Sequence, residues 1–328
     1  GSPMKNRVLT CLAATLAIGA ATSPPALADG LPVPVEDTFG EGVVAPDGAS
    51  RFVSIGAGEK TVIMRVSLDG GEVADYATVD GTYTIPAIAV DGTASGVSAN
   101  GETLALISPR QTFPRKTTEF LVYDADRLRK PTAIQLDGDF SFDALSPDGE
   151  TLYLVEYTNP RDYDDYQVRS FDLASETLDP EPILDSEEDP DDMRGLPQTR
   201  VTSPDGRWEY TLYDGGGGEP FIHALDVVEG ATVCIDLPMI SPGKTYGAKL
   251  EIGDDGSSVE LYDRKETMHA VVDGETLEAV EPGAEPAESD AADADETSGI
   301  PAGLIAGGAA MLSLGGVLLI RRSRSRAA

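Results

Sequence analysis

The chain has 328 residues, of which 57 are Asp or Glu and 24 are Lys or Arg, and its formal net charge is −33. This excess of negative charge excludes nucleic acid and anionic lipid headgroups as partners of the protein body, and favours cations, basic partners or simple solubility. Cys11 lies in the N-terminal leader, so Cys234 is the single cysteine of the mature chain and no intrachain disulfide is expected.

Residues 1–28 have the composition of a cloning remnant followed by a signal peptide. Basic side chains near the N-terminus precede an apolar run over residues 8–21, and Ala26 and Ala28 provide the small residues that a signal peptidase requires. We therefore expect residues 1–28 to be removed, and the mature chain to be exported with Asp29 at its N-terminus.

Residues 29–282 contain one turn motif five times, most clearly as Ser-Pro-Asp-Gly at positions 146–149. Proline presets φ for a turn, aspartate can bond its own backbone, and glycine can take the positive φ of a tight hairpin. The turn glycines are 53, 48, 57 and 50 residues apart. The turn residues are Asp47, Gly48, Asn100, Gly101, Asp148, Gly149, Asp205, Gly206, Asp255 and Gly256.

Short strand-like stretches surround each copy of the turn, four to a repeat. The expected strands are residues 42–44, 51–55, 61–68 and 72–79; 96–98, 103–107, 119–123 and 132–136; 140–145, 152–157, 167–173 and 182–184; 199–202, 208–213, 221–227 and 232–237; and 248–252, 258–262, 268–272 and 276–280. A strand repeat of this period predicts an all-β chain, a β-propeller of about five four-stranded blades. Six blades are the alternative, with a hidden strand pair in residues 82–90.

Four of the expected third strands end in an apolar residue and an aspartate, at Asp124, Asp172, Asp226 and Asp273. Such an aspartate can accept hydrogen bonds from amides of the following turn. Together with the Ser-Pro-Asp-Gly turn, this pattern resembles the WD-repeat-like units of TolB-type β-propellers over residues 43–280. The resemblance implies the fold, whereas propellers of this kind serve as binding platforms, as docks for partners and occasionally as enzymes.

The C-terminal part differs in composition from the repeats. Residues 283–299 are acidic and contain proline and alanine but no large apolar residue, so we expect a disordered stalk. Residues 300–320 are uncharged and long enough for a transmembrane helix, and the arginines of residues 321–328 predict a cytoplasmic tail. Gly303 and Gly307 form a GxxxG pair, which leaves a homodimer through the membrane helix and a single copy as alternatives.

Two acidic loops are candidate binding sites for a ligand or partner. Carboxylate oxygens suit Ca²⁺ in irregular loops, although neither loop has an EF-hand pattern. The alternatives are a contact with a basic partner and a solvated acidic surface. The residues concerned are Asp162, Asp164 and Asp165 in one loop, and Asp185, Glu187, Glu188, Asp189, Asp191 and Asp192 in the other.

The two histidines of the chain, His223 and His269, occupy equivalent positions in the third strands of neighbouring repeats. This equivalence suggests a shared metal site, but neither has the multi-ligand spacing of a zinc site, and packing within a strand is the simpler alternative. No Gly-x-Ser-x-Gly nucleophile elbow occurs, and the four glycines at 215–218 lack the Lys-Ser/Thr pair of a phosphate loop. We assign no catalytic residue.

These observations predict a single-pass protein of the bacterial cell membrane, with the propeller outside the cytoplasm and the C-terminus inside. The first hypothesis for its function is that the protein is a binding or scaffold module, which recognises a cell-envelope protein or ligand. The alternative is a metal-binding protein or metal-dependent hydrolase or lactonase that uses acidic loop residues.

Overall fold

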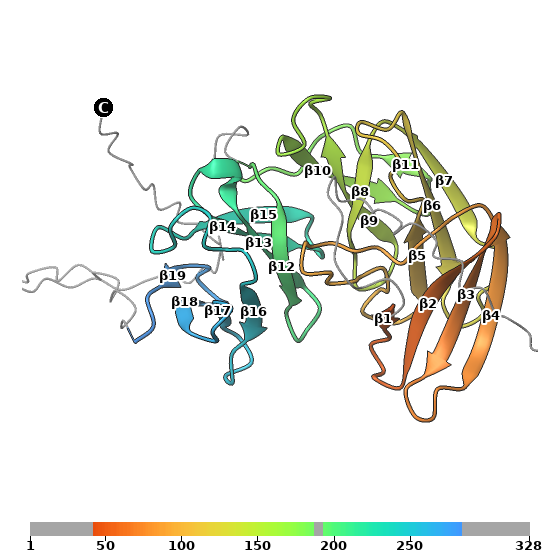
Figure 1. The fold of residues 1–328 in the computed structure, drawn as a ribbon, viewed down its shortest axis with the longest axis horizontal. Helices are drawn as coiled ribbons and strands as arrows, with labels where there is room; N and C mark the ends of the chain where they lie inside the picture. The colour runs from red at the N-terminus through yellow and green to blue at the C-terminus, as the bar shows by residue number, and fades with distance from the viewer. Residues whose placement is uncertain (1–41, 187–192, 284–328) are drawn as a thin grey trace, which may run out of the picture. The chain divides into compact units, whose positions relative to one another are not determined.

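The computed structural model describes residues 42–186 and 193–283. Consecutive strands pair side by side in antiparallel sheets (Figure 1). The first sheet holds β1 (Val43–Val44), β2 (Ser50–Ala57), β3 (Lys60–Ser67) and β4 (Val73–Asp80), and the second β5 (Thr103–Ile107), β6 (Thr117–Asp124) and β7 (Thr132–Asp137). The third holds β8 (Phe140–Leu145), β9 (Thr151–Tyr157), β10 (Tyr166–Asp172) and β11 (Thr177–Leu178).

The fourth sheet holds β12 (Pro197–Thr202), β13 (Trp208–Tyr213), β14 (Phe221–Asp226) and β15 (Ala231–Asp236), and the fifth β16 (Lys249–Ile252), β17 (Val259–Tyr262), β18 (Met268–Val272) and β19 (Ala279–Val280). The one regular helix among the described residues is the 3₁₀ turn η2 (Gly215–Gly217). The prediction of an all-β chain with about five blades is therefore confirmed for this part of the chain.

Within the two described ranges, no helix combines the length and apolar character needed to cross a bilayer. The expected signal peptide at residues 1–28, the membrane segment at residues 300–320 and the tail at residues 321–328 lie outside these ranges, as does the stalk beyond Gly283. These assignments stay predictions.

The repeated turn has the same internal bonding in successive sheets. Asp148 Oδ1 accepts a hydrogen bond from the amide of Glu150 at 3.1 Å, and the hydroxyl of Ser146 accepts one from the amide of Thr151 at 2.9 Å. Gly149 has a φ of 74°, which glycine adopts without steric cost. All of these contacts lie within five residues of one another, which explains why the turn could be located from the sequence.

Turns of different sheets also contact one another. The amide of Asn100 donates to the carbonyl of Pro147 at 2.9 Å, and its side-chain Nδ2 donates to the carbonyl of Asp148 at 2.9 Å. A Cβ on Gly149 would come within 2.3 Å of Thr103 Oγ1 in the second sheet. The turns of the second and third sheets are thus joined at one end of the fold.

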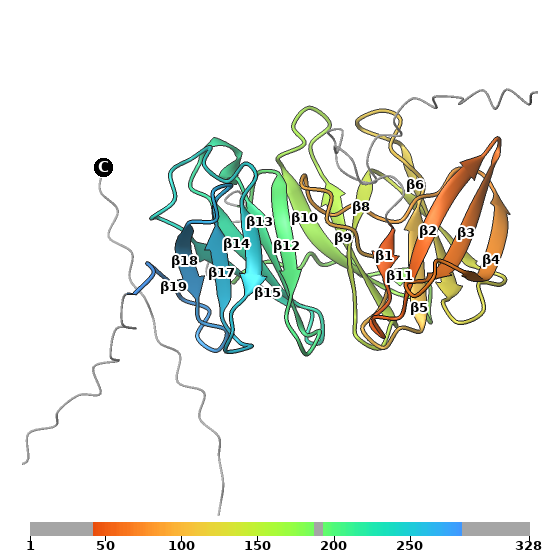
Figure 2. The same cartoon turned by 60° about the horizontal axis from the view of Figure 1, so that its bottom comes forward.

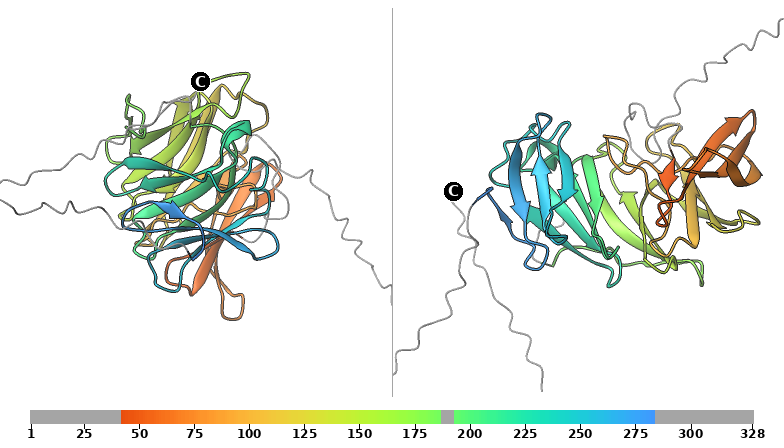
Figure 3. Two further views of the ribbon diagram at one scale, coloured as in Figure 1. Left: turned by 90° about the vertical axis from the view of Figure 1, so that its left-hand side faces the viewer. Right: turned by 90° about the horizontal axis from the view of Figure 1, so that it is seen from below.

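Four hydrophobic clusters fill the spaces between successive sheets, and Figures 2 and 3 show each sheet beside the sheets that precede and follow it in the chain. Each strand contributes alternate side chains to such a cluster, as its period of two residues requires. Representative members, in chain order of the interfaces, are Phe52 with Leu104, Phe120 with Phe142, Val155 with Phe221, and Leu212 with Leu261.

The second sheet has three strands, and the expected strand at residues 96–98 is reduced to an isolated antiparallel bridge beside β5. Val97 forms only an isolated bridge to Leu104, and Thr84 forms another to Ile107. The residues between these bridges leave the sheet and contact the fourth sheet, where the amide of Val90 donates to the carbonyl of Pro197 at 2.9 Å. This excursion, rather than the strand pair of a sixth blade, occupies the stretch at residues 82–90.

The closing strand of the third sheet is also displaced from its expected position. Strand β11 pairs with the end of β10, and residues 182–184 contribute only the isolated bridge between Ile183 and Val168. Glu176 has a positive φ of 55° in the turn between the two strands. A tight turn after Asp172 therefore brings the chain back earlier than the hydrophobic pattern suggested.

Candidate functional site

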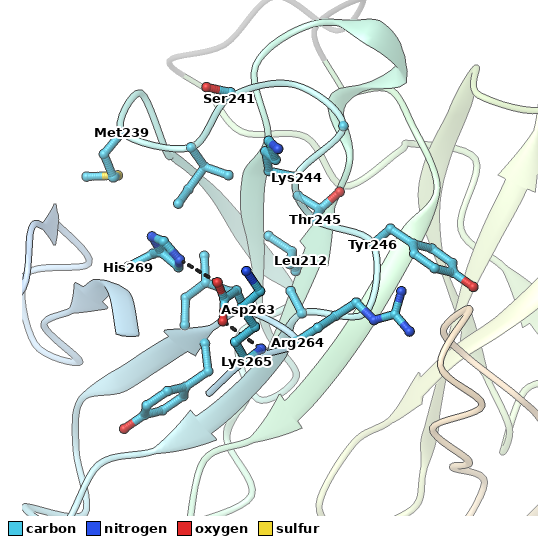
Figure 4. Close-up of a pocket in the computed structure, with 15 residues that line it drawn as sticks. Leu212, Met239, Ser241, Lys244, Thr245, Tyr246, Asp263, Arg264, Lys265 and His269 are labelled. Carbon is cyan, nitrogen blue, oxygen red and sulfur yellow. Dashed lines mark hydrogen bonds and ion pairs between the residues drawn. The ribbon is translucent and has the colours of Figure 1, made fainter. Parts of the chain in front are cut away.

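A pocket of about 500 Å³ lies between the fourth and fifth sheets (Figure 4). Its floor consists of apolar side chains of both sheets, including Leu212 of β13 and Leu261 of β17, which are 0% and 3% exposed. The connection between β15 and β16 covers it on one side, and the turn between β17 and β18 on the other. The pocket thus has an apolar base and two loop-built walls.

The connection between β15 and β16 folds as a series of short turns. The amides of Ile240, Lys244 and Ala248 each donate to a carbonyl three residues earlier, at 2.9, 3.1 and 2.9 Å. Gly247 has a φ of 71°, and a Cβ there would come within 2.5 Å of Arg264 Cγ. Glycine at this position therefore lets the arginine of the opposite wall pack directly on the loop backbone.

Asp263 shapes the opposite wall. Its Oδ1 accepts hydrogen bonds from the amides of Lys265 at 2.7 Å and Thr267 at 3.0 Å, and its Oδ2 lies 3.1 Å from His269 Nε2. The Thr267 amide and the His269 side chain lower the pKa of Asp263 to about 2. Asp263 is therefore ionised at any physiological pH and holds the turn that presents Arg264 and Lys265.

Three cationic side chains and one carboxylate line the pocket. Lys244 lies on the loop across the pocket from the turn that carries Arg264 and Lys265 (Figure 4). Arg264 Cζ lies 5.4 Å from the ring centroid of Tyr246, an aromatic contact that restrains the guanidinium at the rim. Asp263 is the carboxylate, and its three partners already engage it. The remaining charge of the pocket is positive, in a chain that carries 57 acidic residues.

A carboxylate and an imidazole lie side by side in the lining of the pocket. Asp263 and His269 form the kind of pair that orients a general base. Ser241 and Thr245 are the serine and threonine hydroxyls of the lining, and Figure 4 draws neither with a bond to His269. With an apolar floor and separate cations on two walls, the arrangement suits binding of a ligand that has an apolar body and an anionic group.

The acidic loop at Asp162 is an internally bonded structure. Asp162 pairs with Arg194 and accepts a hydrogen bond from the amide of Asp164, which together lower the pKa of the Asp162 carboxyl. Burial and the neighbouring charges of Asp162 and Asp214 raise the pKa of Asp164. The structure thus brings Asp162 and Asp164 together, and it gives Asp162 an arginine partner that the sequence did not suggest.

The other predicted acidic residues have different surroundings. Asp165 contacts Thr158 Oγ1 at 3.3 Å and Asn159 Nδ2 at 3.2 Å, within its own loop. Asp185 Oδ2 accepts a hydrogen bond from the amide of Cys234 at 2.8 Å, so it fastens the loop to β15. Glu187, Glu188, Asp189, Asp191 and Asp192 lie outside the described residues.

The two histidines have separate environments. His223 is 1% exposed in β14, with its Nε2 3.0 Å from Thr232 Oγ1, whereas His269 lines the pocket and pairs with Asp263. Within residues 42–186 and 193–283, no three His, Cys, Asp or Glu side chains are grouped as a metal site would require. The shared metal site and the Ca²⁺ site stay predictions.

Sequence reasoning missed the cationic pocket. Its basic side chains come from two connections 20 residues apart, and no pairing pattern in the sequence joins them. A weak signal was present, because Lys244, Arg264 and Lys265 lie within a short stretch of a chain that is poor in basic residues.

No family model matches the chain, and no curated protein matches it. Three solved structures are similar to it at low identity. TolB from Acinetobacter baumannii matches with a TM-score of 0.39 and 12% identity, over 70% of this chain and 50% of TolB. The Cps50 (Swd1) β-propeller domain from Myceliophteria thermophila matches with a TM-score of 0.42 and 11% identity, over 72% of this chain and 65% of that domain.

Prolyl oligopeptidase B from Galerina marginata matches with a TM-score of 0.46 and 11% identity, over 73% of this chain and 33% of the oligopeptidase. This chain therefore spans between a third and two thirds of the length of these structures. The identity of the blades rests on the order of their strands and on the turn between the first two strands of each repeat. By these two features the described residues form blades of the β-propeller type.

Proposed function

We propose that the protein is a binding module without catalytic activity, and that its pocket between the fourth and fifth sheets receives an anionic group carried on an apolar body. The observation that carries this proposal is the lining of the pocket, where Lys244, Arg264 and Lys265 stand above an apolar floor. A carboxylate or phosphate would accept hydrogen bonds from these cations, and its apolar part would cover Leu212 and Leu261.

The charge of the rest of the chain makes this site selective. Other acidic residues repel an anion at long range, whereas the pocket attracts it at short range. At about 0.15 M salt the long-range part is screened beyond about 8 Å, so the contacts within the pocket decide the affinity. A ligand with its charge at one end and apolar groups at the other matches this arrangement better than a uniformly charged one.

Hexanoate tests the proposal, with hexanol and hexylamine as neutral and cationic probes of the same length. In calorimetric titrations of the full chain, we expect hexanoate to bind at least about tenfold more tightly than hexanol, a difference of about 1.4 kcal/mol. Replacement of both lysines (Lys244→Met with Lys265→Met) should remove this preference. Lys249→Met removes one lysine charge on β16 away from the pocket lining, and should leave hexanoate binding within about twofold.

Two results would contradict the proposal: equal binding of hexanol and hexanoate, or equal weakening by Lys249→Met and by the double lysine replacement. Turnover of a hexanoate ester that depends on His269 would contradict the non-catalytic part alone.

We also propose that this module is displayed outside the cytoplasm on a single membrane helix. The support comes from the sequence: an apolar leader over residues 8–21, the acidic stretch at residues 283–299, and an uncharged segment at residues 300–320 followed by arginines. Protease added to intact expressing cells should cleave the chain between the propeller and the membrane. Protection of the whole chain until the cells are lysed would refute this topology.

A further inference from the structure

One face of the first sheet carries apolar side chains that no other sheet within residues 42–186 and 193–283 covers. The register pairs Val53 with Met64 and Ile55 with Val62, and it pairs Met64 with Tyr76 of β4, so these five side chains share a face. The opposite face holds Phe52 and Ile63, which belong to the cluster shared with the second sheet. We call the face of Val53, Ile55, Val62, Met64 and Tyr76 the free face of the first sheet.

The free face is exposed to an extent unusual for apolar side chains. Ile55 is 50% exposed and Tyr76 is 67% exposed, and Val44 and Val73 at the neighbouring edges are 54% and 51% exposed. Val62 and Met64 are half-buried, and Val53 is buried, at 6%. A contiguous apolar patch of this kind on a sheet is typical of a surface that another segment covers.

The fifth sheet is chemically unsuited to cover it. The inward side chains of β16 and β17 belong to the cluster with the fourth sheet, so the alternate positions point the other way. Those alternate positions pair Lys249 with Tyr262 and Glu251 with Glu260. Packing two carboxylates against valine, isoleucine and methionine would bury unpaired charge, which is strongly unfavourable.

We infer that residues 31–35 of this chain, Leu-Pro-Val-Pro-Val, pack on the free face. The described structure begins at Gly42, beside this face: a Cβ on Gly42 would come within 2.7 Å of Val53 Cγ1. Residues 29–41 of the expected mature chain therefore start from the surface that needs a cover.

The length and composition of the segment fit this role. The six residues 36–41 can span about 20 Å, and the first sheet is about 14 Å wide, so residues 31–35 can reach every strand of the face. Leu31, Val33 and Val35 alternate with Pro32 and Pro34, which lack the amide needed for a central strand of a ladder. Contact through side chains on a face requires no such donors. This inference is independent of the pocket.

Disulfide trapping in the full chain tests the inference. Val33→Cys is combined in turn with Ile55→Cys, Met64→Cys and Tyr76→Cys, and the matched control combines Val33→Cys with Glu251→Cys on the outward face of the fifth sheet. After mild oxidation, we expect at least one free-face pair to form an intramolecular disulfide with a yield at least about fivefold above the control. Single-cysteine chains measure the background from Cys11 and Cys234.

Two outcomes would overturn the inference. A Met64→Cys chain that forms disulfide-linked dimers without Val33→Cys would show that a second copy covers the face. Yields equal to the Glu251→Cys control for all three pairs would show that residues 31–35 do not reside there.

Discussion

Replacement of Arg200 by methionine is expected to lower the free energy of unfolding by about 3–5 kcal/mol, because it leaves a buried carboxylate without its partner. Arg200 of β12 donates to the carbonyl of Asp143 at 2.6 Å and also to its Oδ1, and its Nε donates to Thr211 Oγ1 at 2.7 Å. The side chains of Arg200 and Asp143 are each 3% exposed. This pair joins the third sheet to the fourth.

Glu209 adds to the loss of stability expected for Arg200→Met. Burial raises the pKa of the Glu209 carboxyl, and the nearby charge of Arg200 opposes that rise. Without the positive charge of Arg200, the pKa of Glu209 should rise further, because the hydrogen bond from Thr202 Oγ1 at 2.8 Å is then the main interaction that favours the carboxylate. The loss of one arginine therefore affects two buried carboxyl groups.

Urea denaturation of the wild type and of three variants measures this contribution. Arg65→Met is the matched control, because Arg65 is 26% exposed and pairs with the exposed Asp47 and Asp126, so its loss should cost at most about 1 kcal/mol. Combining Arg200→Met with Asp143→Leu removes both charges of the pair and should recover much of the loss. A cost for Arg200→Met as small as that for Arg65→Met would disprove the assigned role.

The repeated features of the fold were predictable because they are local. The carboxylate of Asp226 accepts the amides of Val228 and Glu229 at 3.0 Å each, and that of Asp273 accepts the amides of Glu275 and Thr276 at 2.9 and 2.8 Å. These bonds connect residues two or three positions apart, so a short sequence motif specifies them. The same holds for the Ser-Pro-Asp-Gly turns and the strands that follow them.

The departures from the expected blades depend on contacts between distant residues. The inner edge of the second sheet is interrupted because the stretch that contains Val90 bonds to Pro197 more than 100 positions later. Gly96 permits the bend, with a φ of 115° and a would-be Cβ only 2.7 Å from the carbonyl oxygen of Ala105. The glycine at position 96 indicates a bend in the sequence, but it does not indicate which distant strand the neighbouring residues contact.

The candidate site was hidden for a related reason. Runs of acidic residues in the sequence indicated binding loops. In the structure, however, Asp162 already pairs with Arg194, which lies 32 positions away in the chain. The pocket, in contrast, assembles Lys244 and Arg264 from separate connections, and neither position belongs to a motif. A sequence pattern shows a run of like charges directly. It does not show a site whose residues come from two separate loops, because only the pairing of the strands brings those loops together.

His223 should make the protein sensitive to mild acid. Burial lowers the pKa of its imidazole from 6.5 to about 4. The charge of Asp143 opposes this shift and that of Arg200 adds to it. Below pH 6.5 the unfolded chain therefore binds a proton that the folded chain does not. The contribution of this group to stability is complete above pH 6.5 and decreases until the pH reaches about 4, by a total of about 3 kcal/mol.

Comparison of His223→Gln with the wild type isolates this effect, because all other groups titrate in both proteins. The unfolding free energy of the wild type should fall between pH 7.5 and pH 4.5 by about 2–3 kcal/mol more than that of His223→Gln. His269→Gln provides the control: His269 is exposed beside Asp263, so its loss should leave most of the extra acid sensitivity in place. If His223→Gln and the wild type lose stability in parallel over this range, the imidazole takes up its proton in the folded state and the buried, neutral assignment is wrong.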